Sequence, residues 1–118
     1  MARISTHVLD TARGVPAEGI EVSLCRLRGD ERVVVASSVT NADGRTDVPL
    51  LAGDAVETGI YELTFHAGAY LARTSGRIAA APPFLDEIVI RFGVGDATAS
   101  YHVPLLLSPF GYSTYRGS

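Results

Sequence analysis

Three side chains in this sequence have the chemistry that acid–base catalysis needs, although they lie far apart in the chain. His7 falls within an alternating run near the N-terminus, Arg45 follows a turn glycine, and His102 opens an apolar run near the C-terminus. A histidine with an ordinary pKa of about 6.5 exchanges protons near neutral pH, and an arginine offers a planar fork of donors to an anion. Each also has a bland interpretation as a structural or solvated side chain, and residue type alone leaves both open.

The remaining reactive groups do not favour metal, thiol or phosphate chemistry. His7, His66 and His102 stand singly rather than in the short-spaced pairs typical of zinc sites, so we predict no metal and no cofactor, although a site assembled only by the fold stays open. His66 ends a predicted strand and is expected to face solvent. The single cysteine, Cys25, lies within a strand pattern and is expected to pack rather than react. The sequence contains no P-loop, dinucleotide fingerprint or nucleophile elbow.

The C-terminal residues 109–118 form an unusually aromatic chain end. They include Phe110, Tyr112 and Tyr115, whereas chain ends are normally polar and frayed. This composition predicts a tail that docks onto protein. The tail serves either as packing in a core or interface, or as part of a site.

Composition bounds the class of protein. A chain of 118 residues with 47% hydrophobic and 19% charged residues is typical of one globular domain, here residues 1–118. A net charge of -3 gives no reason to expect nucleic acid or a membrane surface as partner. One cysteine, with no leader-like segment and no long apolar run, favours a cytoplasmic protein.

The elements that must position these residues are predicted to be strands. Short alternating runs separated by Gly, Pro and Asn/Asp are typical of an all-β sandwich, and the run 41–44 is a strong turn signal. In the first run, Ile4, Thr6 and Val8 share one face, opposite Ser5, His7 and Leu9. The sequence 53–58 has room for one helical turn at most, and 79–83 is predicted to be a loop. Strands are predicted at 3–10, 20–27, 33–40, 47–51, 60–66, 69–74, 87–93 and 101–107.

Seven to eight strands on this length predict a two-sheet Greek-key sandwich whose strands end near Leu107. An immunoglobulin-like module would give the same pattern. The Cys–Trp–Cys signature of that class is absent, because the sequence contains no Trp.

Three motifs together resemble one family. Residues 102–118, HVPLLLSPFGYSTYRGS, resemble the C-terminal signature of the 5-hydroxyisourate hydrolases, the transthyretin-related enzymes. Residues 5–11 with 14–17 are similar to the N-terminal motif of that family, and residues 41–45 to its middle motif. The likeness spans the whole chain. Two positions depart from the pattern: Ser100 stands where the family often has a second histidine, and Leu85-Asp86 replaces an aromatic residue followed by proline.

The resemblance implies both a fold and an activity. The fold is a transthyretin-like sandwich that assembles as a homotetramer, a dimer of dimers with two elongated sites at the dimer–dimer interface. The activity is that of a cyclic amide hydrolase in urate breakdown. It converts 5-hydroxyisourate to 2-oxo-4-hydroxy-4-carboxy-5-ureidoimidazoline without a metal.

The resemblance also implies which residues act. Its motifs assign catalysis to His7, Arg45, His102 and Ser118. They assign substrate binding to His7, Arg45, Tyr115, Arg116 and Gly117. One histidine would activate water while the other orients it or carries the proton, and the sequence does not decide which. Arg45 would anchor the substrate and stabilise the developing oxyanion.

The tail is expected to be held by its own side chains. The rings of Phe110, Tyr112 and Tyr115 would pack, and a carboxylate would hold Arg116. Two other interpretations remain open: a transthyretin-type ligand carrier without chemistry, and an interaction module whose tail is only an oligomer contact.

Overall fold

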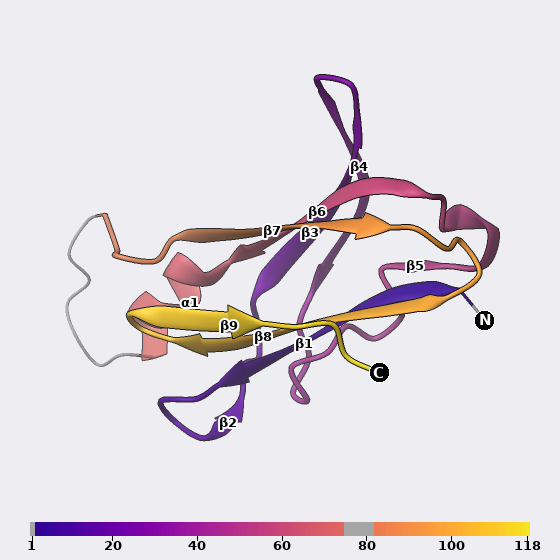
Figure 1. Cartoon of the computed structure of the whole chain (residues 1–118). Coiled ribbons are helices and arrows are strands. Elements are labelled where there is room, and N and C mark those ends of the chain that lie inside the picture. The colour runs from indigo at the N-terminus through magenta and orange to yellow at the C-terminus, as the bar shows by residue number, and fades with distance from the viewer. Residues whose placement is uncertain (1, 75–81) are drawn as a thin grey trace.

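Two β-sheets face each other across the core of this computed structural model, which describes residues 2–74 and 82–118 (Figure 1). The first sheet runs in the order β2–β1–β8–β9, with β5 paired to β1. It contains β1 (Arg3–Asp10), β2 (Val15–Pro16), β5 (Leu51–Ala52), β8 (Ser100–Ser108) and β9 (Gly111–Thr114). The second runs in the order β4–β3–β6–β7. It contains β3 (Glu21–Arg28), β4 (Glu31–Val39), β6 (Gly59–His66) and β7 (Glu87–Val94). The predicted all-β sandwich is confirmed.

The core forms where the inward faces of the two sheets meet. Ile4 and Val8 of β1 are fully buried and alternate with outward-facing neighbours, as the sequence predicts. The second sheet contributes Leu24, Leu63 and Phe65 to the core, and these side chains are also fully buried. Period-two alternation therefore decides which side chains of β1 remain on the outer face, and these include His7.

Parallel pairing of β1 with β8 joins the two ends of the chain. In this register Ser5 lies opposite His102, and His7 lies opposite Pro104. The side chain of Thr6 donates a buried hydrogen bond of 2.7 Å to the Val103 carbonyl and fixes the two strands side by side. Residues almost a hundred positions apart in sequence thus share one outer face.

One predicted strand is wrong: residues 69–74 belong to helix α1 (Ala67–Thr74), at one end of the sandwich (Figure 1). Ala67, Tyr70 and Leu71 are all buried, and that spacing suits a helix face rather than the alternate sides of a strand. The Tyr70 hydroxyl donates a 2.7 Å hydrogen bond to the Asp10 carboxylate, and burial beside this anion raises the pKa of Tyr70. Tertiary contact outweighs the strand propensity of this short segment.

The expectation that the strands end near Leu107 is also wrong. Residues Gly111–Thr114 form β9, which turns back from β8 and pairs with it antiparallel. The described residues therefore hold nine strands, of which β2 and β5 have two residues each. The strand predicted at 47–51 shortens to β5, and the one helical turn is η1 (Gly53–Ala55). Of the predicted loop 79–83, residues 79–81 lie outside the described part, and Pro82 and Pro83 are not in a strand.

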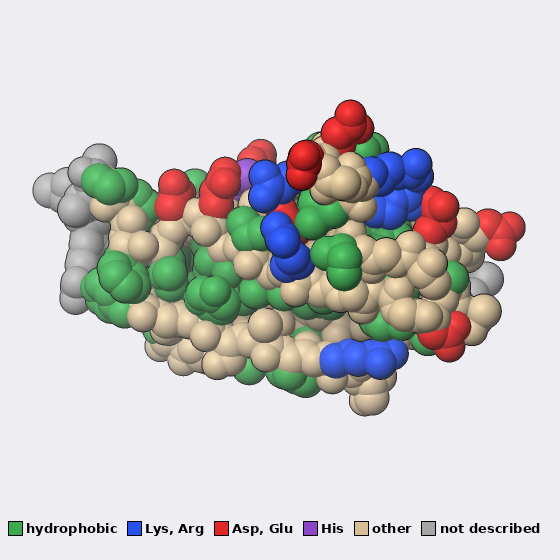
Figure 2. Space-filling view, turned by 45° about the horizontal axis from the view of Figure 1, so that its top comes forward, with side chains coloured by type: hydrophobic (Ala, Val, Ile, Leu, Met, Phe, Trp, Pro, Cys, Tyr) green, Lys and Arg blue, Asp and Glu red, His purple; other side chains and the backbone are tan. Residues whose placement is uncertain are grey.

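The outer face of the second sheet carries an ion-pair cluster. The Glu62 carboxylate, with 7% of its side chain exposed, accepts hydrogen bonds from Arg32 at 2.7 Å and from Arg91 at 2.7 and 2.9 Å. Hydrogen bonds from the two guanidinium groups lower the pKa of Glu62, so the carboxylate stays charged. Figure 2 turns this sheet toward the viewer and shows blue and red side chains among hydrophobic ones. None of the helices in the described residues is long and apolar enough to cross a membrane.

Candidate active site

His102 lies at the start of β8 with its ring half-buried, and it faces β1. Its Nδ1 atom lies 2.9 Å from the Ser5 hydroxyl, on the opposing position of the parallel pair. Burial lowers the pKa of His102, and electrostatic interactions with Arg45, His7 and Arg3 lower it further. His102 is therefore mostly neutral near pH 7, as a proton acceptor must be.

His7 is positioned by the turn that the sequence predicts at 41–44. Its Nε2–H group donates a 2.8 Å hydrogen bond to the Asp43 carbonyl, since a carbonyl can only accept. The turn depends on Gly44, whose φ of 75° lies in the left-handed region. A Cβ at Gly44 would collide with the Val8 carbonyl oxygen, so this position requires glycine.

Arg45 leaves that turn directly beside His7. The two residues form an isolated antiparallel bridge, and the Asn41 side chain accepts hydrogen bonds from the backbone N–H groups of Asp43 and Arg45 at 2.9 and 3.2 Å. The backbone around Arg45 is thus fixed while its side chain remains exposed. The middle motif of the sequence therefore delivers a guanidinium to the outer face of β1.

The C-terminal tail reaches the same place from the other side. The Gly117 N–H group donates a 2.8 Å hydrogen bond to the His102 carbonyl, and the two residues form an isolated bridge. A Cβ on Gly117 would lie 2.5 Å from Cδ2 of the His102 ring, so only glycine permits this approach. The strand β9 and this bridge hold the tail, and they place Ser118 beside His102.

The expected packing of the tail by its own side chains is wrong for the single chain. Phe110, Tyr112 and Tyr115 are 66%, 45% and 59% exposed. Among the described residues, no salt bridge holds Arg116: its guanidinium lies 4.3 Å from the centre of the Tyr101 ring and donates to the Ser100 carbonyl at 3.3 Å. Backbone pairing therefore fixes the tail, and its aromatic rings remain exposed to solvent.

An open hollow of about 380 Å³ lies where these segments meet. Of the residues that the sequence assigns to a site, Arg45, His102 and Ser118 line it. His7 adjoins it through Arg45, Gly117 lies against the His102 ring, and Tyr115 and Arg116 are not part of its lining. The lining consists of Arg3, Ser5, Thr6, Arg45, Thr46, Asp47, Val48, Pro49, Ser100, His102 and Ser118.

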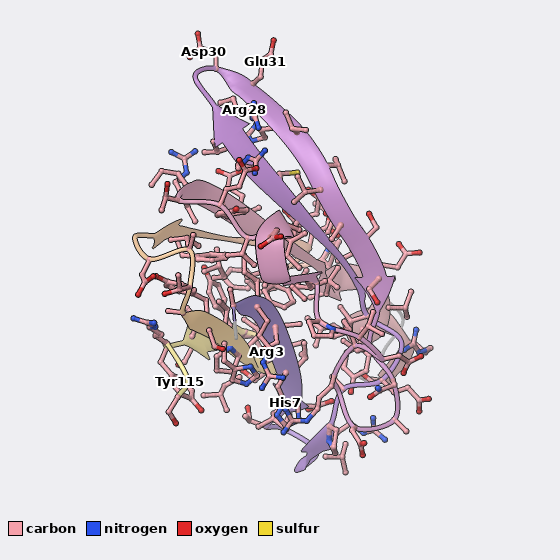
Figure 3. The ribbon with its side chains drawn as sticks, turned by 90° about the vertical axis from the view of Figure 1, so that its right-hand side faces the viewer. Arg3, His7, Arg28, Asp30, Glu31 and Tyr115 are labelled. Atoms are coloured by element: carbon pink, nitrogen blue, oxygen red, sulfur yellow. The ribbon has the colours of Figure 1, made fainter. Side chains whose placement is uncertain are left out.

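Sequence reasoning missed Arg3. The alternation of buried and outward-facing residues in β1 could have identified it, because Arg3 occupies the same face as Ser5 and His7. Figure 3 shows Arg3 and His7 near each other on this strand, far from the β3–β4 hairpin tip that carries Arg28.

The arrangement suits hydrolysis of a polar substrate. A neutral histidine can take a proton from water, and guanidinium groups can bind a developing oxyanion. Among residues 2–74 and 82–118, no group of three or more His, Cys, Asp or Glu side chains is placed to hold a metal ion.

Comparison with known proteins shows the family. The model of the HIUase/transthyretin family matches residues 4–117. A curated relative named 5-hydroxyisourate hydrolase, from Deinococcus radiodurans, is 56% identical over 98% of this chain and 95% of its own length.

Solved structures agree in fold. The Klebsiella pneumoniae 5-hydroxyisourate hydrolase superposes with a TM-score of 0.80 at 41% identity, covering all of both chains. A structure of (S)-allantoin synthase superposes at 0.89 with 44% identity, covering 99% of this chain, which spans only 44% of that longer chain. Sea bream transthyretin in complex with thyroxine superposes at 0.86 with 25% identity, covering 98% of this chain and 94% of that one. The chain belongs to the HIUase/transthyretin family.

Proposed function

We propose that this chain is a single-domain 5-hydroxyisourate hydrolase, a cyclic amide hydrolase of urate breakdown. The observation that carries the proposal is the convergence of His102, Arg45 and the chain end Ser118 on one hollow. The name of the 56%-identical relative supplies the substrate. The fold alone does not decide the function, because a thyroxine-binding transthyretin superposes equally well.

The reaction is addition of water to a ring amide. The water oxygen bonds to the carbonyl carbon while a base takes one of its protons. The C–N bond then breaks, and the ring nitrogen leaves with a proton. The product acid ionises at neutral pH, so the reaction creates a carboxylate. The proposed hydrolysis uses no metal or other cofactor.

His102 is the better candidate for the general base. Its pKa is lowered by burial and by neighbouring cations, and its Ser5 contact orients the ring. His7 has its Nε2–H group committed to the Asp43 carbonyl, which suits a residue that orients water or returns the proton. This assignment goes beyond the sequence, which treats the two histidines alike.

Arg45 and the tail complete the proposed site. The exposed guanidinium of Arg45 would anchor the substrate and stabilise the oxyanion. Ser118 would approach the substrate with its hydroxyl or carboxylate, and Tyr115 to Gly117 would bind substrate once a partner chain covers them.

A homotetramer, a dimer of dimers, would supply that cover. The hollow is open, and exposed aromatic residues flank the tail: Phe84 and Phe110 are 74% and 66% exposed, with ring centres 5.8 Å apart. Large exposed apolar side chains grouped together often mark an interface. A cytoplasmic location stays a prediction, supported by the single free cysteine.

The test is a spectrophotometric assay in which urate oxidase generates the unstable substrate in place. The purified chain is expected to accelerate decay of the intermediate's absorbance, and a His102→Ala variant is expected to lose this effect. Treatment with a chelator should leave the rate unchanged. A protein that binds urate derivatives without accelerating their decay would be a carrier, and this result would reject the proposed activity.

A further inference from the structure

We infer that Arg3 is a second anion-binding residue of the site, which with Arg45 holds the oxygen rim of the substrate and the carboxylate formed by ring opening. This inference rests on the proposed function. It adds a residue that lies outside the motifs carrying the family resemblance.

The geometry of β1 directs Arg3 to the site. Arg3 lies two and four residues before Ser5 and His7, and alternation places all three on the outer face of the sheet. In the parallel pair with β8, Arg3 opposes Ser100 and Ser5 opposes His102, so Arg3 is one pleat from the catalytic histidine. The side chain lines the hollow together with Arg45 and Ser118.

In the described part of the chain, Arg3 is not engaged in a salt bridge. Within residues 2–74 and 82–118, its guanidinium forms none of the ion pairs found, whereas other arginines do: Arg32 and Arg91 pair with Glu62, and Arg26 and Arg28 pair with Glu57. An exposed cation that lines a hollow without a carboxylate partner is available to a ligand.

The charges around the hollow are mixed, and cations dominate near His102. Arg3 and Arg45 line the hollow and His7 adjoins it, and interactions with all three lower the pKa of His102. The acids are the chain end at Ser118 and Asp47, whose carboxylate already accepts a 3.0 Å hydrogen bond from the Asn41 side chain. A bound anion would therefore meet two guanidinium groups on either side of the proposed base.

The chemistry of the reaction explains why a second guanidinium helps. Ring opening converts a neutral amide carbonyl into a carboxylate, so negative charge grows during the reaction. Arginine binds carboxylates in a two-bond geometry that lysine cannot reproduce. The same positive charge keeps the nearby imidazole neutral, which preserves a proton acceptor at pH 7.

The experiment compares Arg3→Gln and Arg3→Lys with Arg28→Gln as a matched control. Arg28 is an exposed arginine at the far hairpin tip (Figure 3), with a side chain 59% exposed. For each variant, kcat and KM are measured across pH in the coupled assay. The affinity for urate, a planar purine anion used as the probe, is measured by calorimetry, and the melting midpoint reports the fold.

Arg3→Gln is expected to raise KM and to weaken urate binding by about ten-fold, the loss of one charge-assisted hydrogen bond. It should also move the acid limb of kcat/KM to higher pH, because a cation that disfavours protonated His102 is gone. Arg3→Lys should restore the position of the acid limb but only part of the affinity. Arg28→Gln should match the wild type.

Failure of this inference differs from failure of the proposed function. A wild type that hydrolyses the substrate, together with an Arg3→Gln variant of unchanged KM, urate affinity and pH profile, would overturn the role of Arg3. A wild type without hydrolysis, whose urate binding still weakens in Arg3→Gln, would reject the activity and support the anion site. If Arg3→Gln fails to fold, unchanged urate affinity and an unchanged pH profile in Arg3→Lys would equally count against the inference.

Discussion

The three histidines of the chain have the same side chain but different environments. His102 is half-buried among cations, His7 donates to a backbone carbonyl, and His66 is 39% exposed with its Nδ1 atom 3.4 Å from the Glu87 carboxylate. Only the first two adjoin the hollow. Environment, rather than residue type, therefore separates a candidate catalytic histidine from a surface one.

At the residue scale, we expect His7→Ala, Arg45→Ala and His102→Ala each to lower turnover by about 100-fold, the usual cost of one acid–base or oxyanion partner. The fold should persist, because none of these side chains belongs to the hydrophobic core. His66→Ala is the matched control and should keep wild-type activity. Turnover in the coupled assay and the melting midpoint give the two readouts, and full activity in either site-histidine variant would contradict its role.

The pH dependence of activity follows from His102. Its pKa lies below the ordinary 6.5, so the neutral form prevails at pH 7 and is lost only as pH falls through the lowered value. We expect kcat/KM to be flat around neutrality and to decline with a midpoint below about 6.5. A pH series in the coupled assay measures this limb. An acid limb centred above pH 7 would show that His102 is not the base.

Among the elements, β9 and the tail position the chain end beside His102. β9 pairs with β8 as far as Leu105 and Thr114, and three residues further along each segment Gly117 lies against the His102 ring. Because backbone atoms make this contact, it does not depend on the exposed aromatic side chains of the tail. The precision of the site at this point depends on the absence of a Cβ.

We therefore expect Gly117→Ala to lower activity by about ten-fold or more, because the tail must move away from His102 and a displacement of about 1 Å is costly to catalysis. Gly95→Ala is the matched control, since a Cβ there meets nothing within 4 Å. Both variants should melt like the wild type. A C-terminal affinity tag should likewise damage activity more than an N-terminal tag. A fully active Gly117→Ala protein would show that the tail contact is not part of the site.

In the single chain, the candidate site and the tail beside it are open to solvent. The hollow is open, and the tail rings of Phe110, Tyr112 and Tyr115 are largely exposed. Both features are explained if further copies cover the outer face of the first sheet. Closure by symmetric copies would also exclude bulk solvent from the site and leave only the reacting water beside the carbonyl.

Light scattering at micromolar concentration is expected to give about 50 kDa, the mass of four chains of 12.5 kDa. Phe110→Ser removes an exposed ring and should shift the mass toward smaller species and lower the activity with it. Val34→Ser, on the outer face of the second sheet, should change neither the mass nor the activity. A wild-type mass of one chain with full activity would remove the basis for a site completed by partners.

The sequence predicts correctly the features that local patterns encode. Alternation identified β1 and its two faces, the Asn–Asp–Gly turn located the bend before Arg45, and the apolar run located β8. The motifs also marked the histidines and Arg45 that meet around the hollow. The predictions of the strands and the turn succeeded because side-chain period and turn chemistry depend only on near neighbours in the chain.

Long-range contacts account for what the local patterns missed. Residues 67–74 form a helix whose buried Tyr70 donates a hydrogen bond to Asp10, 60 positions away in the chain. The guanidinium of Arg116 lies over an aromatic ring instead of the predicted carboxylate. The parallel pairing of β1 with β8 brought Ser5 and Arg3 beside His102, over sequence separations near a hundred residues. No local pattern encodes such contacts, because they depend on which buried faces the two sheets present to each other.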